Sequence, residues 1–564
     1  MKNRKITALL QELRNQIMYI ESLYPQVHNY PAVYTLLLLN RGIKSLFIKK
    51  SALYETIIHL KTLLYKKVIK KFNLEVNMKR KGLHKLALLA LCSGLLLSGC
   101  TSGPAKEAEK KSTIKVMYWD ESYFFQQYGD LFAMKHPNID IEVVSTQSIY
   151  SGSSGEIVDY EKATKDFIEK EQPDVLMLDT GNFETYATEG KLQELDTLIE
   201  RDKYDTETIY PGLLDLLKQK GEGKLYGMSP SFSGSVIYYN ADLFQKYGVE
   251  LPHDGMTWQE IMDTARRFPT DGDEKTRVYG FGYQYGGFTL DNLASQIAGT
   301  QGLKRINPDT MKITLNTDSW KQVYKMAMDA IDSNALYNPK EGGFSGGTME
   351  EYYQSQPFLM GRMAMIVEGS YMLQSLKEAK NAIKDYTPFK IGMAAGPVDP
   401  ASPDTTRNLY FNEVFSVRAN SPNVDAAWEF IKFINGEEYA KVKSRTMNNG
   451  LLSRMGYSKE YDGQNLDVFY KLKPSAEDNN RNMEKIPSDF YMQYQPIVDR
   501  EMGLVKDKSK SIEEALKTIE DEGQVVLDKA VKDQAEKKQN GDSGSTDGAS
   551  TSGDSGAGVT IITK

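Results

Sequence analysis

The sequence predicts an α/β protein whose folded part, residues 113–530, is built from two lobes. Three observations carry this prediction. Strand-like and helical segments alternate after residue 111, which is typical of a mostly parallel sheet flanked by helices. A strand-like segment is again followed by helical segments at 227–268, where the signals for helix ends are clear. The folded part is also too long for one comfortable hydrophobic core, so it suits two.

The first stretch of this region alternates strictly. We expect three strands and two helices, in chain order at 112–119 (strand), 122–137 (helix), 139–146 (strand), 160–172 (helix) and 173–179 (strand). Sheets of this kind bind ligands at the carboxyl ends of their strands. Those ends lie near Trp119 and Asp120, and near Asp179 and Thr180.

The segment 227–268 carries the strongest local signals. Residues 235–240 are β-branched and aromatic, which predicts a strand. The helix expected at 241–248 ends at Gly248. The next helix, 257–268, begins with a capping box in which Thr257 is the N-cap and Glu260 follows three residues later.

An export signal is predicted at 78–99. A basic flank, 78–85, precedes an apolar run of twelve residues that ends in Leu-Ser-Gly-Cys at Cys100. A membrane-spanning helix needs about 20 apolar residues, whereas a signal peptide core needs roughly 7–15. The segment resembles a bacterial lipoprotein signal, in which Cys100 is the lipidated first residue of the mature chain. The alternative is a buried helix that happens to end in cysteine.

The composition of the segments on either side of the folded part predicts their roles. Residues 1–77 are basic and apolar, and we expect an over-extended start with the true one at Met78; a membrane-surface segment is the alternative. Residues 100–112 form a small, charged tether. Residues 537–564 are rich in Gly, Ser and Asp, which predicts a disordered tail.

Charge and cysteine usage exclude several classes of function. Residues 1–99 contain 17 Lys and Arg against 4 Asp and Glu, which leaves 52 against 72 in the mature chain, a net charge of −20. Nucleic-acid binding is disfavoured because phosphate contacts need clustered cations. The two cysteines are Cys92 and Cys100, and His136 and His253 are the only mature histidines. No disulfide and no four-ligand structural zinc site can therefore be assembled in the mature domain.

Four segments in order resemble motifs of the family 1 extracellular solute-binding proteins, and together the resemblance covers 113–530. They are 172–196, 224–268, 358–373 and 425–455. Two departures blur the inference about ligand. Pro230 stands one residue later than the family's usual proline, and Tyr371 stands where sugar-binding members commonly carry Trp.

The resemblance implies a periplasmic-binding-protein-like fold with a ligand cleft between two α/β lobes. Lobe 1 is expected at 113–230 with part of 397–450, and lobe 2 at 231–396 with part of 451–530. The family captures solutes, most often oligosaccharides, and delivers them to an ABC permease. We therefore expect a non-enzymatic, lipid-anchored protein on the outer face of the bacterial cytoplasmic membrane, bound to the bilayer through Cys100, with no cofactor and no metal.

Ligand contacts are carried over from the family's cleft positions. The expected ligand-binding residues are Trp119, Asp120, Asp179, Phe232, Ser233, Tyr285, Tyr371, Tyr410, Asn412 and Glu413. The alternative for each is a surface tyrosine or a helix-capping carboxylate. The other tryptophans, Trp258, Trp320 and Trp428, occur in helical apolar patterns that predict core positions.

Other functions stay open at this point. The sequence GFSGG at 343–347 fits Gly-x-Ser-x-Gly, but no histidine follows His253, so the hydrolase order Ser, Asp, His is impossible. A glycosidase needs only two carboxylates, such as Asp120 and Glu413. The loop 271–276 lacks the spacing of a calcium loop. A receptor that presents ligand to a membrane sensor, or a non-sugar ligand such as a peptide, would use the same fold.

Overall fold

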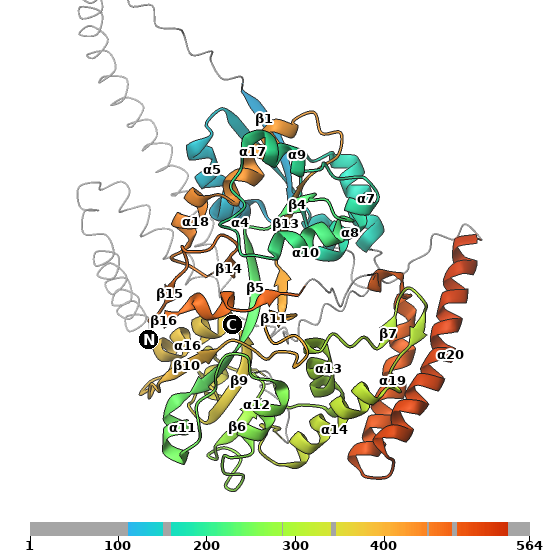
Figure 1. The fold of residues 1–564 in the computed structure, drawn as a ribbon. Coiled ribbons are helices and arrows are strands. Elements are labelled where there is room, and N and C mark those ends of the chain that lie inside the picture. The colour runs from blue at the N-terminus through green and yellow to red at the C-terminus, as the bar shows by residue number, and fades with distance from the viewer. Residues whose placement is uncertain are drawn as a thin grey trace, which may run out of the picture. The chain divides into compact units, whose positions relative to one another are not determined.

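The computed structural model describes residues 111–150, 160–284, 286–339, 346–447, 450–475 and 482–539. All described residues belong to one unit of the chain, Glu109–Lys564 (Figure 1). The predicted signal peptide, Cys100 and Tyr285 lie outside the described residues, as does most of the predicted tail.

A five-stranded sheet organises the first part of the fold. Its order is β2-β1-β3-β13-β4. The strands are β1 (Ser112–Tyr118), β2 (Ile139–Ser145), β3 (Val175–Leu178), β4 (Gly227–Met228) and β13 (Val414–Val417). The helices of this part of the chain are α4 (Glu121–Phe124), a π-helical turn (Phe125–Gly129), α5 (Asp130–Lys135), α6 (Gln147–Tyr150), α7 (Tyr160–Glu171), α8 (Thr180–Thr188), α9 (Asp196–Asp202), α10 (Leu213–Lys220), α17 (Val424–Ile434) and α18 (Glu437–Lys443).

The predicted strands and helices of this region are confirmed, with two differences. The helix expected at 122–137 is divided by the π-helical turn into α4 and α5. The sheet is also less parallel than expected. β1 is parallel to β2 and β3, whereas β13 is antiparallel to both β3 and β4. The reason is topological, because β13 enters this sheet directly from a strand of the other sheet and not through a crossover helix.

A six-stranded sheet organises the second part. β10-β5-β9-β6 form its main path, and β12 and β14 also pair with β5. The strands are β5 (Ser231–Asn240), β6 (Tyr279–Gly282), β9 (Met363–Gly369), β10 (Ile391–Ala394), β12 (Leu409–Phe411) and β14 (Leu451–Leu452). Only β6 and β9 run parallel; the other pairs are antiparallel.

Two short segments carry the chain between the sheets. Ser229 and Pro230 join β4 to β5, and Asn412 and Glu413 join β12 to β13. We call these the crossing segments. In Figure 1 the long arrow of β5 runs from the level of the first sheet down to β9 in the second. Side chains on the crossing segments therefore lie where the two sheets meet.

The local signals around β5 are confirmed. β5 extends to Asn240 but begins at Ser231, four residues before the predicted start. Gly248, with a φ of 64°, ends α11 (Ala241–Tyr247). Thr257 and Glu260 form the capping box of α12 (Trp258–Ala265).

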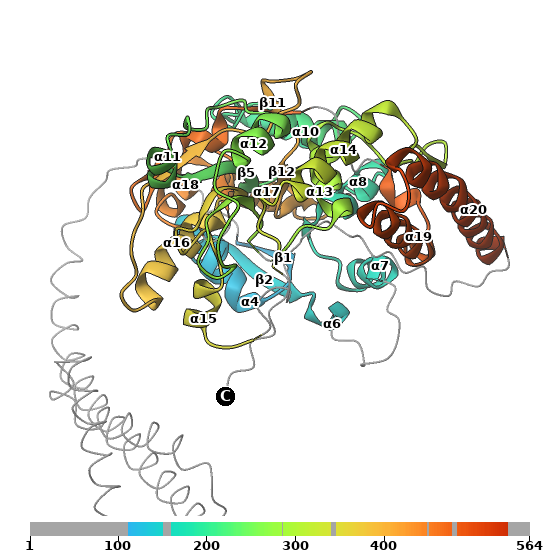
Figure 2. The ribbon, with the colours of Figure 1, turned by 90° about the horizontal axis from the view of Figure 1, so that it is seen from below.

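The remaining elements complete the second part. The helices are α13 (Leu290–Thr300), α14 (Asp318–Asp332), α15 (Met349–Gln354), α16 (Tyr371–Ala382), α19 (Ser488–Lys506) and α20 (Ile512–Gln539), with 3₁₀ turns at Leu466–Tyr470 and Met483–Lys485. Three two-stranded ribbons pair β7 (Ile306–Asn307) with β8 (Lys312–Ile313), β11 (Thr405–Thr406) with β17 (Lys473–Pro474), and β15 (Glu460–Tyr461) with β16 (Gln464–Asn465). Figure 2 shows α19 and α20 side by side near α13 and α14. α20 runs through Gln539, so the first three residues of the predicted tail are helical.

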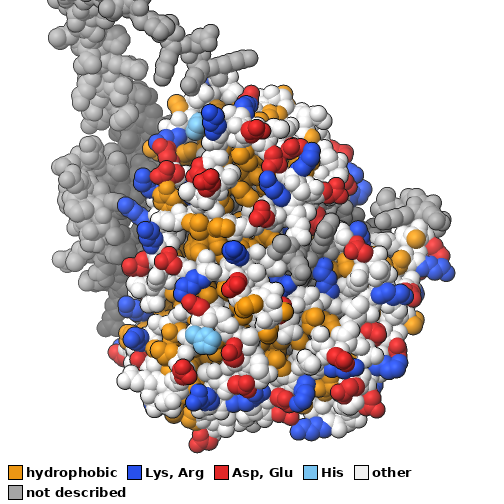
Figure 3. Space-filling model, viewed as in Figure 1, with side chains coloured by type: hydrophobic (Ala, Val, Ile, Leu, Met, Phe, Trp, Pro, Cys, Tyr) orange, Lys and Arg blue, Asp and Glu red, His pale blue; other side chains and the backbone are white. Residues whose placement is uncertain are grey.

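Three of the four tryptophans are core residues, as predicted. Trp428 has no exposed surface, and Trp258 and Trp320 are also buried. The surface mixes acidic and basic side chains on the face drawn in Figure 3, with no large area of one sign. None of the helices in the described part is long and apolar enough to cross a membrane.

Candidate functional site

A pocket of about 320 Å³ opens beside the crossing segments. Its walls come from β5, β12, the start of α16 and the chain that precedes β14. The lining residues are Ser233, Gly369, Ser370, Tyr371, Gln374, Tyr410, Asn412, Glu413, Met447 and Gly450. Five of the ten predicted ligand-binding residues are therefore brought together in one place, although they span 181 positions of sequence, from 233 to 413.

Strand pairing explains one wall. Tyr410 in β12 is directly opposite Ser233 in β5 in the antiparallel register. Residues opposite each other on such a pair have neighbouring side chains. The Ser233 hydroxyl donates a hydrogen bond to the amide oxygen of Asn412 over 2.9 Å. The wall therefore presents a hydroxyl, an amide and an aromatic ring that is 58% exposed.

A close backbone approach also shapes the pocket beside this wall. Gly450 has a φ of +87°, in the region that favours glycine. A Cβ atom there would lie 2.6 Å from the Phe232 carbonyl oxygen and 2.9 Å from the Asn412 amide nitrogen. The segment before β14 can therefore reach β5 only because this position has no side chain.

Glu413 forms the floor nearest the first sheet. Its carboxylate accepts a 2.5 Å hydrogen bond from the hydroxyl of Tyr118, at the end of β1, and another from the hydroxyl of Tyr128. Both tyrosines are fully buried. Burial raises the pKa of Glu413, and the two hydroxyl donors partly offset that rise. Glu413 is thus a carboxyl group with both oxygens already hydrogen-bonded to protein.

Tyr371 forms the wall from the second sheet. It begins α16, directly after the last residues of β9, and its side chain is 39% exposed. Its hydroxyl donates a hydrogen bond to the carboxylate of Glu368, which is only 5% exposed. Burial raises the pKa of Glu368 to about 8, and the backbone N–H groups of Gln284 and Gly369 lower it less.

An aromatic pair lies on the first-sheet side. The rings of Trp119 and Tyr123 have centroids 4.7 Å apart, and the Trp119 side chain is 40% exposed. Burial raises the pKa of Tyr123, and the nearby charge of Glu413 raises it further. Tyr123 is therefore near enough to Glu413 to feel its charge, although Trp119 is outside the pocket lining.

Both predicted aspartates cap helices. Asp120 is the N-cap of α4 and accepts a 2.7 Å hydrogen bond from the Tyr123 N–H. Asp179 is the N-cap of α8 and accepts bonds from the N–H and the side-chain amide of Asn182. Neither belongs to the pocket lining. Helix capping was the alternative role considered for these aspartates, and the structure shows both of them as helix caps.

Phe232 is turned into the core. Its side chain has no exposed surface and contacts the rings of Tyr210 and Tyr470. Alternation along β5 explains this placement, because successive side chains point to opposite faces and Ser233 faces the pocket. We therefore leave Phe232 outside the candidate ligand contacts. Tyr285 lies outside the described residues.

Sequence reasoning missed half of the lining. The missed residues are Gly369, Ser370, Gln374, Met447 and Gly450. A signal existed for Gln374, because it lies three residues after Tyr371 on a helix and so shares its face. Met447 and Gly450 gave no such signal, since only the return of the chain to β5 brings them to the pocket.

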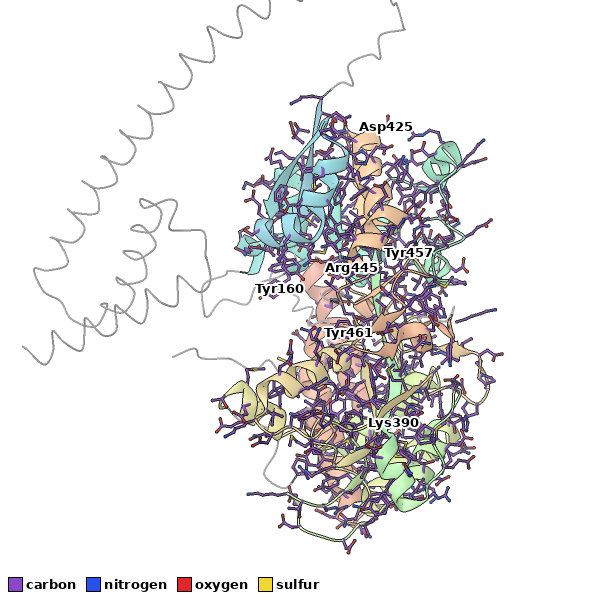
Figure 4. All side chains as sticks on the ribbon, turned by 90° about the vertical axis from the view of Figure 1, so that its left-hand side faces the viewer. Tyr160, Lys390, Asp425, Arg445, Tyr457 and Tyr461 are labelled. Atoms are coloured by element: carbon purple, nitrogen blue, oxygen red, sulfur yellow. The ribbon has the colours of Figure 1, made fainter. Side chains whose placement is uncertain are left out.

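The lining carries acidic and neutral polar groups, and no Lys or Arg is among the described lining residues. Figure 4 shows Arg445, on the turn after α18, at a level between Asp425 of α17 and Lys390 before β10. Arg445 is exposed and is not part of the lining. Nowhere in the described part do three His, Cys, Asp or Glu side chains gather as a metal site would require.

The known proteins that this chain resembles are binding proteins. Residues 117–441 match the sequence model of the family described as bacterial extracellular solute-binding protein. A binding protein of Brucella abortus is 24% identical over 398 residues, which cover 68% of this chain and 86% of the relative. The sn-glycerol-3-phosphate-binding periplasmic protein UgpB of Escherichia coli is 24% identical over 336 residues, which cover 58% and 72%.

Two solved structures share the fold. A sugar transporter from Rhizobium etli, in an open conformation, is 20% identical with a TM-score of 0.52, and the match covers 73% of this chain and 99% of that one. The sugar-binding protein MalE from Xanthomonas citri is 14% identical with a TM-score of 0.51, covering 74% and 98%. The α/β architecture with two separate sheets is thus that of periplasmic binding proteins.

Proposed function

Because the chain belongs to the bacterial extracellular solute-binding proteins, a family of binding proteins and not of enzymes, we propose that its pocket captures a neutral saccharide. Four lining residues would make the main contacts. Tyr371 and Tyr410 offer partly exposed rings to the C–H faces of a sugar, and Ser233 and Asn412 offer hydrogen bonds to its hydroxyl groups. Aromatic side chains together with precisely placed polar groups are common in small-molecule sites.

One observation carries the choice of a neutral ligand. The described lining contains Glu413 and no Lys or Arg. A phosphate ester would bring negative charge into the pocket without a cation among the described lining residues to balance it. This favours a sugar over sn-glycerol 3-phosphate, the solute named for UgpB.

The experiment is a thermal-shift and calorimetric screen against neutral mono- and oligosaccharides, with sn-glycerol 3-phosphate and short peptides as competing classes. A ligand at 100 times its dissociation constant stabilises the folded state by about 2.7 kcal/mol, which is readily seen as a higher melting temperature. The proposal expects a selective shift with one saccharide class. A shift only with the phosphate ester or a peptide would overturn it.

We also propose that the protein is held at the outer face of the cytoplasmic membrane through a lipid on Cys100. The support is the sequence of the signal at 78–99, which lies outside the described residues. Palmitate labelling and membrane fractionation of wild type and Cys100→Ser test this. Wild type should carry label and sediment with membranes, and the variant should do neither.

Delivery to an ABC permease completes the proposed role. If an ABC permease takes up the saccharide, cells that lack that permease should lose uptake while the purified protein still binds the saccharide. Uptake that persists, together with loss of a sensor-dependent transcriptional response when this gene is deleted, would favour the receptor role instead.

A further inference from the structure

The end of β9 places a buried carboxyl group directly behind the pocket wall. Glu368 is the last residue but one of β9 and pairs with Val236 of β5. Its side chain is buried and is not part of the pocket lining. The Tyr371 hydroxyl reaches back over one turn to donate a hydrogen bond to it. The hydroxyl of the partly exposed Tyr371 side chain is thus hydrogen-bonded to a residue of strand β9.

The same ring is also confined by the backbone of the neighbouring Gly369. A Cβ atom on Gly369 would lie 2.9 Å from Cε1 and 3.0 Å from Cδ1 of Tyr371, so the ring lies against the glycine backbone. The Gly369 carbonyl in turn accepts a 3.0 Å hydrogen bond from the buried Tyr238 hydroxyl. The backbone that the ring rests on is therefore itself fixed in the core.

We propose that Glu368 is a positioning residue, which fixes the ring of Tyr371 as a wall of the pocket and thereby sets the affinity of the pocket for its ligand. The part of this inference that concerns affinity rests on the proposed saccharide function. A ring that is already in its binding orientation loses less freedom when the ligand arrives, and pre-organisation of this kind raises affinity.

The contact is sensitive to protonation. Tyr371 from α16 and Tyr238 from β5 are the titratable groups that face Glu368 in the described part. Burial raises the pKa of Glu368 to about 8. An ionised carboxylate accepts a hydroxyl proton more strongly than a neutral carboxylic acid does. The ring should therefore be held more firmly above pH 8 than at pH 6.5.

The first test needs no ligand. The full chain is labelled with ¹³C at the Cζ atom of tyrosine, and the Tyr371 signal is assigned by its loss in Tyr371→Phe. In wild type this signal should shift with a midpoint near pH 8 as Glu368 ionises. In Glu368→Gln the step should vanish. A step of the same size and midpoint in Glu368→Gln would overturn the positioning role.

The second test measures affinity for the saccharide identified in the screen. At pH 9, where Glu368 is ionised, Glu368→Gln and Tyr371→Phe should each weaken binding about tenfold. The double variant should bind no more weakly than either single one, because both remove the same contact. Wild-type affinity should rise between pH 6.5 and 9, and this rise should be absent in both variants. Tyr353→Phe is the matched control, since it breaks a tyrosine–carboxylate bond to Glu378 outside the pocket.

The outcomes separate the two proposals. Additive losses in the double variant at pH 9, or wild-type affinity in Glu368→Gln at that pH, would contradict the inference even if the saccharide binds. If no saccharide binds wild type, the proposed function fails, and the labelled tyrosine alone decides whether Glu368 fixes the ring. Melting temperatures of all variants near that of wild type would show that a change in affinity is not a loss of folding.

Discussion

The carboxylate of Glu413 accepts a 2.5 Å hydrogen bond from the hydroxyl of Tyr118, although the two residues are 295 positions apart in the sequence. Tyr118 ends β1 in the first sheet, and Glu413 lies on the crossing segment that comes from β12. Its neighbour Asn412 is held by Ser233 of β5 in the other sheet. Two adjacent residues are therefore anchored to different sheets, and the pocket lies where these anchors meet.

The first prediction concerns this anchor. Glu413→Gln should lower the free energy of unfolding by about 1–3 kcal/mol, because a buried acceptor of two tyrosine hydroxyls is replaced by a group that can accept fewer of them. Urea unfolding measures the change. Glu438→Gln is the control, since the exposed pair of Glu438 with Lys135 should contribute less than about 1 kcal/mol. Equal losses in the two variants would contradict the anchoring role.

The second prediction separates capping from ligand contact at Asp179. Asp179→Ala should destabilise the protein by about 1 kcal/mol, the usual effect of losing an N-cap. It should leave the dissociation constant of the saccharide within twofold of wild type. Asp179→Asn keeps a capping oxygen and should restore most of the stability. A loss of affinity in both variants would return Asp179 to the ligand site.

The third prediction is a pH dependence of stability. The pKa of Glu368 is raised from its ordinary value of 4.5 to about 8 in the folded state. Between these values the folded state holds a proton that the unfolded state releases, so this contribution to stability is full below pH 4.5 and is lost as pH rises through 8. Unfolding free energies between pH 5 and 9 should therefore fall by about 1–4 kcal/mol more in wild type than in Glu368→Gln.

The slope should not vanish entirely in that variant. Burial also raises the pKa of Glu413, which contributes in the same direction. Parallel curves for wild type and Glu368→Gln across this range would contradict the buried, proton-holding state of Glu368.

The fourth prediction concerns the pocket's backbone. Gly450→Ala should lower both stability and affinity, because its Cβ would collide with the Phe232 carbonyl and with the amide of Asn412 at a φ of +87°. Gly456→Ala is the matched control, since that glycine also has a positive φ but has open space around its Cβ position. Calorimetry and thermal unfolding of both variants make the comparison. Equal effects would assign the loss to backbone strain alone.

The sequence predicted the elements of the fold better than their pairing. Local signals are sufficient for α12, where Thr257 and Glu260 form the capping box by themselves. Burial of Trp428 also followed from helical spacing. The sequence did not predict the direction of β13. This strand is antiparallel to β3 because the chain reaches it directly from β12, which is paired with β5 in the other sheet.

The candidate site shows the same division. The family resemblance predicted Ser233, Tyr371, Tyr410, Asn412 and Glu413 as site residues, and the structure brings these five together in one pocket. Glu368 was not expected, because nothing in its sequence context distinguishes a buried carboxyl group that holds a tyrosine from an ordinary surface glutamate. That distinction depends on the burial of the β9 end and on the direction of the Tyr371 side chain, which are tertiary properties.

The central claim is that the pocket beside the crossing segments binds a neutral saccharide through Tyr371 and Tyr410. The most direct measurement is calorimetric titration of wild type, Tyr371→Ala, Tyr410→Ala and the exposed-tyrosine control Tyr160→Ala with the saccharide that shifts the melting temperature. Wild type and the control should bind the saccharide with equal affinity, and the two pocket variants should bind it at least about tenfold more weakly. Equal affinity in all four proteins, with each of them folded, would place the ligand outside this pocket and contradict binding through Tyr371 and Tyr410.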